Sequence, residues 1–205
     1  MLAESVRPDS RAHVAILPAL TTDVLAQAGL RPTDVEAVAV SIGPGSFTGL
    51  RIGLAFAKGI AFAGGVPMVA VPTLEALAAV AEAPSGTTVC AALDARKREC
   101  WTALFRVGGD GGLERLTDDL TLAPAALADR LPEGCILVGD AGTAYADVLG
   151  ARALVRPFST HHPRGGLVAR LGAIRLAAGE RADTGTLEPV YGRPPDAEPS
   201  RKASR

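Results

Sequence analysis

The sequence has few aromatic side chains and no excess of charge of either sign. Phe, Trp and Tyr make up 4% of the 205 residues, although 48% are hydrophobic, so a core must be built from Ala, Val, Leu and Ile. This composition is typical of an α/β protein whose helices pack closely on a sheet. The chain carries 21 Lys and Arg against 22 Asp and Glu. That balance gives no indication of a broad basic surface for nucleic acid on this chain alone.

Cysteine motifs and long apolar runs are also missing. Cys90, Cys100 and Cys135 form no CxxC pair, so we expect buried, reduced thiols. The first residues contain no apolar signal-peptide core, and no apolar run is long enough to span a bilayer. We therefore expect a cytoplasmic protein that makes no membrane contact.

The first segment of helical character covers residues 11–28. Ser10 can cap this helix and Gly29 can end it, whereas Pro18 should bend it or delay its start because proline lacks an N–H group. Its apolar residues are spread over more than one stripe: Val14, Ile16, Leu17, Leu20, Val24 and Leu25. A helix that is apolar on two faces must bury both. It therefore lies inside this protein or presents one face to another chain.

A strand–helix–strand unit follows, and then a short helix. The pattern places these four elements at residues 35–42, 46–64, 66–73 and 74–83. Gly64 and Gly65 end the long helix, and Thr73 is expected to cap the short one. This spacing is typical of a crossover between two parallel strands.

The apolar pattern is interrupted at residues 83–87, "APSGT", and we expect the boundary between two lobes there. Beyond it the pattern predicts strands at 87–96, 99–107, 113–122 and 135–140, and helices at 123–131, 142–149 and 163–179. We therefore expect an N-terminal lobe of residues 1–84, a C-terminal lobe of residues 85–192 and a mobile tail of residues 193–205.

The segment "GPGSFTGLRIG" at 43–53 has the form of a loop that binds an anion at a helix start. A P-loop requires Gly-Lys-Ser/Thr, but Gly49 is followed by Leu50 and Arg51. The dinucleotide fingerprint also fails, because Thr48 stands where its third glycine would be. Both familiar phosphate-binding motifs are therefore absent from this loop.

Small residues form a stripe along the helix that begins there. Gly49, Gly53 and Ala57 are spaced four apart and lie on one face. Each of the two glycines costs roughly 1 kcal/mol relative to alanine in a helix. Such a stripe lets another backbone approach closely, either this chain's own sheet or a partner helix. Arg51, near the positive helix start, is better placed for an acidic partner or a carbonyl. The pattern favours contact over catalysis.

Residues 43–61, "GPGSFTGLRIGLAFAKGIA", resemble the signature of the TsaB family, also called YeaZ. Further stretches agree with the family in order and spacing: "RAHVAILPAL" (11–20), "VAVPTLEALA" (69–78), "LDARKRECW" (93–101), "LVGDAG" (137–142) and "LEPVYGRPPDA" (187–197). The resemblance implies an α/β, actin-like (ribonuclease-H-like) fold of two lobes. It also implies a non-catalytic subunit of the machinery that makes threonylcarbamoyladenosine in tRNA.

The resemblance implies partners as well. The catalytic homologue TsaD would bind directly, the ATPase TsaE and tRNA would join through the complex, and ATP and metal are expected in the partner subunits, with no cofactor in this chain. The implied partner-binding residues lie on the helices at 11–28 and 46–64: His13, Ile16, Leu17, Leu20, Val24, Ser46, Phe47, Thr48, Gly49, Leu50, Arg51, Gly53 and Ala57. The two helices that carry them are the one with two apolar faces and the one with the glycine stripe.

Two features depart from the family pattern. Members normally open with a strand that carries an Asp-Thr-Ser pattern and with a hairpin return, and this chain begins after them. We therefore expect a first lobe that is incomplete at its N-terminus and leaves a neighbouring strand without partners. Gly192 stands where the family usually has leucine, so we expect a weaker contact of the C-terminal segment.

Two other functions stay open. An actin-like enzyme that itself uses a nucleotide would need phosphate loops from both lobes, and the first of these loops is absent. Asp94 and Asp140 follow strands, as catalytic carboxylates often do. A local turn with Arg96 and a helix cap, respectively, are simpler roles for them. A homodimer through the same two helices is the other alternative, because a two-fold interface needs only one patch.

The remaining polar candidates predict no catalytic or metal-binding residue. His161 and His162 are adjacent, so their side chains do not share a helix face, and no third ligand stands at a suitable spacing. Ser46 lies outside the Gly-x-Ser-x-Gly elbow of serine hydrolases.

Overall fold

The computed structural model describes residues 1–7 and 13–192. Its helices are α1 His13–Ala28, α2 Phe47–Gly64, α3 Thr73–Ala78, α4 Pro124–Ala128, α5 Ala141–Ala144, α6 Ala146–Leu149 and α7 Gly165–Ala177, with 3-10 helices η1 Pro32–Asp34 and η2 Ala79–Ala81. Its strands are β1 Val38–Ser41, β2 Met68–Val71, β3 Thr88–Asp94, β4 Cys100–Val107, β5 Leu113–Arg115, β6 Leu120–Leu122, β7 Ile136–Val138 and β8 Leu154–Val155. The predicted cap at Ser10 and the predicted tail at 193–205 lie outside the described residues.

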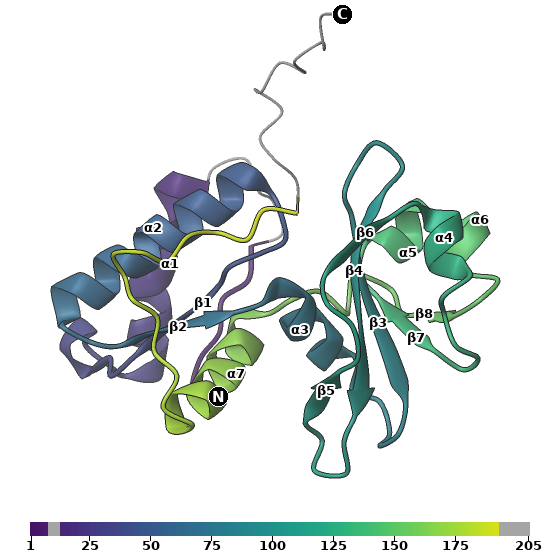
Figure 1. The fold of residues 1–205 in the computed structure, drawn as a ribbon. Helices are drawn as coiled ribbons and strands as arrows, with labels where there is room; N and C mark the ends of the chain where they lie inside the picture. The colour runs from purple at the N-terminus through teal and green to yellow at the C-terminus, as the bar shows by residue number, and fades with distance from the viewer. Residues whose placement is uncertain (8–12, 193–205) are drawn as a thin grey trace, which may run out of the picture.

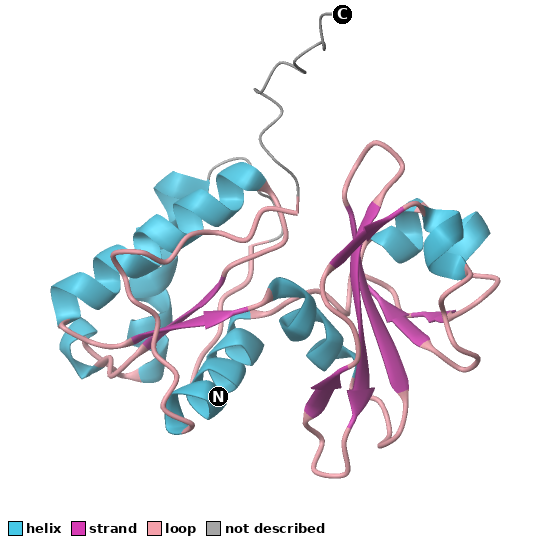
Figure 2. Cartoon of the chain, in the orientation of Figure 1, coloured by secondary structure: helices cyan, strands magenta, loops and turns pink. Residues whose placement is uncertain are grey.

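The described elements form two lobes, each built on its own sheet (Figures 1 and 2). One sheet consists of the parallel strands β1 and β2. The other has the order β5-β4-β3-β7-β8, with β6 also paired to β4. None of the described helices is both long enough and apolar enough to cross a membrane.

Helices cover both faces of the small sheet. Leu54, Ala57 and Ala61 of α2 pack with Met68 and the β1 side chains that point toward α2. On the opposite face, Gly172 of α7 lies so close to Ala39 of β1 that a Cβ atom would overlap the Ala39 methyl group. Neighbouring side chains of a strand point to opposite faces, so β1 is enclosed between α2 and α7.

The larger sheet has a separate core on each face. On one face, Leu74 and Leu77 of α3 pack with Phe105 and other buried residues of β3, β4 and β7. On the other face, α4, α5 and α6 enclose the alternate residues of the same strands, among them Cys90 and Leu137. The antiparallel hairpin β3–β4 and the parallel pairs β3–β7 and β7–β8 make this a mixed sheet.

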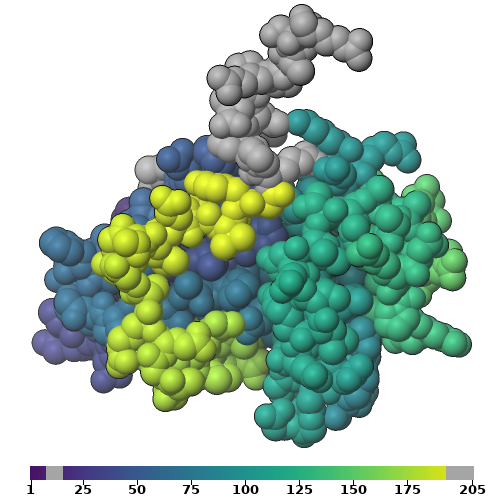
Figure 3. All heavy atoms as spheres, viewed as in Figure 1, coloured from purple at the N-terminus to yellow at the C-terminus, as the bar shows by residue number. Residues whose placement is uncertain are grey.

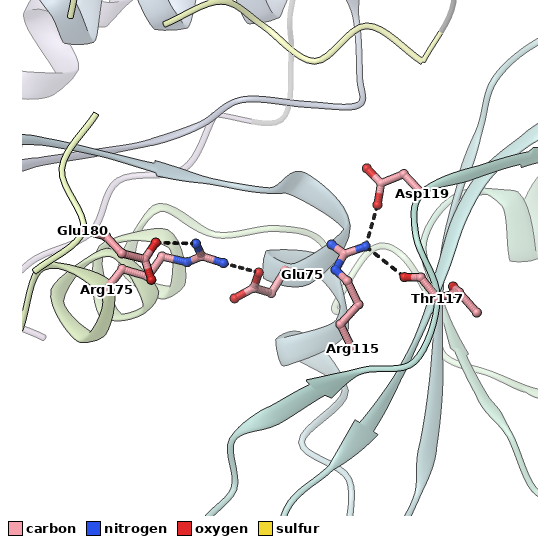
Figure 4. Close-up of polar contacts among 6 residues, drawn as sticks. All are labelled: Glu75, Arg115, Thr117, Asp119, Arg175 and Glu180. Atoms are coloured by element: carbon pink, nitrogen blue, oxygen red, sulfur yellow. Dashed lines mark hydrogen bonds and ion pairs between the residues drawn. The ribbon is translucent and has the colours of Figure 1, made fainter. Parts of the chain in front are cut away.

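An ion-pair network connects α7 to α3, although these helices lie far apart in the sequence (Figure 4). Arg175 donates to Glu75 at 2.6 Å and to Glu180 at 2.9 Å. Because α3 packs on the larger sheet and α7 on the small one, this network joins the two lobes. The predicted division of the chain at residue 84 stays a prediction, and α7 belongs by packing with the small sheet.

Some predicted elements differ from those observed. The predicted strand at 113–122 is two short strands, β5 and β6, which pair with different parts of β4. The predicted helix at 142–149 is interrupted at Tyr145, whose backbone leaves the helical region. Thr73 does not cap α3: Pro72 holds the cap position, while the Thr73 hydroxyl accepts the Gly43 N–H at 3.0 Å.

The segment of residues 187–192, which we call the C-terminal strap, bridges the two lobes. Val190 donates its N–H to the Ile42 carbonyl at 2.8 Å. Gly192 lies against the indole of Trp101 in β4, where a Cβ atom would overlap the ring. We expected Gly192 to weaken the C-terminal contact, but the absence of a side chain is what permits this close packing.

Candidate functional site

The glycine-rich loop before α2 is closed by this chain's own atoms. Gly43 is buried and has a φ of 121°, and a Cβ atom there would overlap the Val190 carbonyl of the C-terminal strap. Its N–H group is donated to Thr73, as described above. Ser46 is the N-cap of α2 and accepts the Gly49 N–H at 3.3 Å. The loop therefore uses these donors internally, which agrees with the failure of both phosphate-binding motifs.

The predicted stripe of small residues on α2 divides into two parts. Ala57 is 5% exposed and packs in the core of the small lobe, so it is not on an accessible surface. Around Gly53, in contrast, the described residues place no atom of another element within 4 Å of a Cβ position, and at Gly49 only the Ser46 side chain comes that close. Close approach of this chain's own sheet therefore does not explain the glycine at position 53.

Aromatic and basic side chains gather at the start of α2. Phe47 is 41% exposed and stacks on Tyr191 of the C-terminal strap with 4.9 Å between ring centroids. The Arg51 guanidinium lies 5.0 Å from the centre of the Phe47 ring. Thr48 is exposed, and the half-buried Leu50 points toward the glycine-rich loop. A cation over an exposed aromatic ring is an arrangement found often at protein interfaces.

Helix α1 lies beside α2 and buries its apolar residues only in part. Ile16, Leu17, Leu20 and Val24 are all half-buried, and no residue of 16–28 is fully buried. His13 begins the helix. Pro18 lies inside α1 and does not delay its start. Helices α1 and α2, which carry the predicted residues, thus lie beside each other on one side of the small lobe (Figure 1).

Two aromatic residues of this region were missed in the sequence. Tyr191 had been noted only as part of a family landmark, and no local pattern indicated its stacking on Phe47. Phe62, near the end of α2, is 87% exposed. The sequence did offer a signal for Phe62: Gly64 and Gly65 mark the end of the helix, where fewer neighbouring elements cover a side chain. A single exposed apolar side chain is common on protein surfaces and does not by itself mark an interface.

The two carboxylates considered for catalysis have structural partners. Asp94 accepts the Arg96 N–H at 2.9 Å, which confirms the predicted turn, and also the Tyr145 hydroxyl at 2.8 Å. Asp140 was expected to cap a helix with its side chain, but it accepts the Asp94 N–H at 2.8 Å. Burial raises the pKa of Asp140. The hydrogen bond to Asp94 raises the pKa of Tyr145 to about 12.

The cysteines and histidines also have structural environments. The three cysteines are buried and free, as predicted. Burial raises the pKa of Cys90 and Cys100 to about 12 and that of Cys135 to about 11. His161 bonds to Thr160 at 2.8 Å, and His162 packs edge-on to Phe158. Within residues 1–7 and 13–192, no three His, Cys, Asp or Glu side chains are grouped to hold a metal ion.

The arrangement of two α/β lobes joined by α3, α7 and the C-terminal strap defines the class of this protein as actin-like, or ribonuclease-H-like. The solved structure of YeaZ from Pseudomonas aeruginosa has this architecture, with a TM-score of 0.76 and 29% identity over 88% of this chain and 84% of that one. Residues 6–135 match the family model described as "TsaD: tRNA N6-adenosine threonylcarbamoyltransferase".

Full-length relatives define the family more closely. The protein "tRNA threonylcarbamoyladenosine biosynthesis protein TsaB" of Escherichia coli is 33% identical over 83% of this chain and 70% of its own length. The protein of the same name in Bacillus subtilis is 31% identical over 97% of this chain and 87% of its own length. The chain belongs to the TsaB family.

Proposed function

We propose that this chain is a non-catalytic subunit of the apparatus that makes threonylcarbamoyladenosine in tRNA, and that it binds the catalytic homologue TsaD through α1 and α2. Two relatives that share most of its length, from Escherichia coli and Bacillus subtilis, are named for this biosynthesis. TsaE and tRNA would join through the complex, and ATP and metal would be bound by the partner subunits. A cytoplasmic location stays a prediction.

The observation that carries the proposal is the open position at Gly53. The glycine lowers the intrinsic stability of α2, and no element of the described chain lies against it. A partner helix that packed there would approach more closely than any side chain allows. The half-buried apolar residues of α1 and the exposed Phe47 would extend the same contact.

The relationship between the two families supports TsaD as the partner. The family model that matches this chain is described as TsaD, so the two proteins have related folds. Related folds can pair equivalent surfaces about an approximate two-fold axis, as homodimers do about an exact one. The partner helices would then correspond to α1 and α2. A homodimer through these helices would use the same surface and would compete with TsaD.

A non-catalytic role agrees with the partners of the candidate catalytic groups. Asp94 and Asp140 hold the β3–β4 turn through three hydrogen bonds of 2.8–2.9 Å. The chain would act on TsaD by binding one of its conformations more tightly than another, because a ligand shifts an equilibrium only through such a difference.

The experiment is co-purification of tagged TsaD with Gly53→Arg. Arginine has a good helix propensity and its Cβ atom would meet no neighbour at position 53, so α2 should remain folded while close approach of a partner is blocked. The matched control is Gly109→Arg, in the β4–β5 turn, where a Cβ atom also meets nothing within 4 Å. We expect the control variant to co-purify with TsaD and the Gly53→Arg variant not to. The circular dichroism spectra of both variants should match that of the wild type. Equal recovery of the two variants would remove α2 from the interface.

A further inference from the structure

The β3–β4 hairpin ends in a turn with an unusual backbone. Arg96, Lys97 and Arg98 have φ values of 62°, 52° and 59°, so three consecutive non-glycine residues are left-handed. This conformation costs roughly 1–2 kcal/mol per residue. Strained positions of this kind persist only where the surroundings fix them, and they cluster at functional sites.

Half-buried polar groups beneath the turn fix its shape. The Asp94 carboxylate is 15% exposed and accepts bonds from the Arg96 backbone and from the Tyr145 hydroxyl. Asp140 holds the Asp94 N–H from the start of α5. Ala95, which is buried, donates its N–H to the Glu99 carbonyl at 2.9 Å. The three cationic residues are therefore carried by a rigid base on two strands and a helix.

Acidic groups lie at the base of this hairpin and cationic groups at its tip, and one ion pair joins the two: the Arg96 guanidinium lies 3.6 Å from the Asp94 carboxylate. Two acidic groups, Asp94 and Asp140, lie below the turn, and the half-buried Glu99 lies at its side. Arg96, Lys97 and Arg98 are all exposed, and the Arg96 side chain is exposed to 86%. The whole chain has a formal charge of −1, so this cationic tip is a local feature and not part of a basic face.

The tip lies beside the proposed TsaD-binding surface without being part of it. Gly192 of the C-terminal strap packs on Trp101, which pairs with Leu93 next to the turn. The same strap stacks Tyr191 on Phe47 at the start of α2. The hairpin and the start of α2 therefore lie at one end of the molecule (Figure 1), and the hairpin projects beyond the body there (Figure 3).

We propose that Arg96, Lys97 and Arg98 bind the phosphate backbone of the substrate RNA while TsaD holds the nucleoside that is modified. This inference rests on the proposed function. Arginine and lysine donate to phosphate oxygens without reading base sequence, and such contacts position the nucleic acid. A turn that is already ordered loses little entropy on binding. RNA is favoured over an acidic protein because the relatives are named for a modification of tRNA.

The test uses the full chain mixed with TsaD and fluorescently labelled, unmodified tRNA, with anisotropy measured over a series of salt concentrations. The variant Lys97→Asn/Arg98→Asn removes two charges and keeps a residue type that tolerates positive φ. The matched control Arg130→Asn/Arg181→Asn makes the same charge change at exposed positions elsewhere. Lys97→Arg/Arg98→Lys keeps the charge and should bind as the wild type does.

We expect the hairpin variant to bind tRNA roughly 10-fold more weakly than the control and to lower the slope of log K against log salt by about 1.5. Unchanged affinity, or an equal loss in the control, would overturn the RNA contact. Light scattering on the same samples reports subunit association. Loss of association in the hairpin variant would assign the tip to a protein contact and also overturn the inference. Failure of the wild-type subunits to associate would instead contradict the proposed function.

Discussion

Enclosed and open glycines occur in both lobes of this protein, and Gly139 of the larger lobe and Gly53 of the small lobe are a clear example of each. In the larger lobe, Gly139 is needed because the backbone of β3 is too close for a side chain: a Cβ atom would overlap the Ala92 carbonyl. In the small lobe, Gly53 faces open space. The larger lobe completes its core on both faces of its sheet, whereas the small lobe leaves α1 half-buried and Phe62 exposed. Glycines that this chain does not itself require are therefore candidates for contact with another.

The largest effect is expected at the enclosed glycine. Gly139→Ala introduces a Cβ atom into the Ala92 carbonyl at a φ of 120°, which an L-residue rarely adopts. We expect the free energy of unfolding to fall by about 3 kcal/mol or more, measured by urea denaturation. Gly109→Ala, in open space, is the control and should change it little. Equal stability of the two variants would show that the larger lobe is not packed as described.

A smaller effect is expected at the C-terminal strap, which joins the lobes. Gly192→Leu restores the residue usual in the family but overlaps Trp101, so the strap should lift from β4. Trp101 is the only tryptophan of the chain, and its fluorescence should shift to the red as water reaches the indole. Val190→Leu, at an exposed position of the same strap, is the control. An unshifted spectrum for Gly192→Leu would mean that Gly192 does not cover the indole.

The smallest effect is expected at the open glycine. Gly53→Ala should raise the free energy of unfolding by about 1 kcal/mol, because alanine favours the helix and its methyl group meets nothing. For a domain of this size the melting temperature should rise by about 3 °C. Gly59→Ala, also in open space on α2, should give a similar rise. A fall in stability confined to Gly53→Ala would reveal a neighbour within this chain and contradict the open environment described for Gly53.

Elements with strong local signals could be predicted from the sequence. Continuous apolar runs indicated β1 and β2, and Gly64 with Gly65 marked the end of α2, where Gly65 adopts the left-handed cap. The break at Tyr145 could not be predicted, since it accompanies a hydrogen bond to Asp94, which lies 51 residues earlier in the chain. The packing of α7 on the small sheet likewise depends on contacts with β1 that no local pattern encodes.

The candidate site could likewise be predicted only where local sequence patterns determine it. Helical spacing placed Gly49, Gly53 and Ala57 on one face, and this spacing is present in α2. The burial of Ala57 could not be predicted from this spacing. It depends on how α2 packs on β1, which decides the part of the helix face that the sheet covers. The packing of Gly192 on Trp101 could not be predicted, because it depends on the approach of the C-terminal strap to β4, and a weaker contact of the C-terminal segment stays a prediction.

The central claim is that TsaD binds this chain through α1 and α2 of the small lobe. Light scattering on this chain, on its cognate TsaD and on an equimolar mixture tests it most directly. We predict a new species in the mixture, with the mass of one copy of each subunit, at the expense of any homodimer of this chain. A mixture whose masses are those of the two separate proteins, with both proteins folded, would contradict the claim.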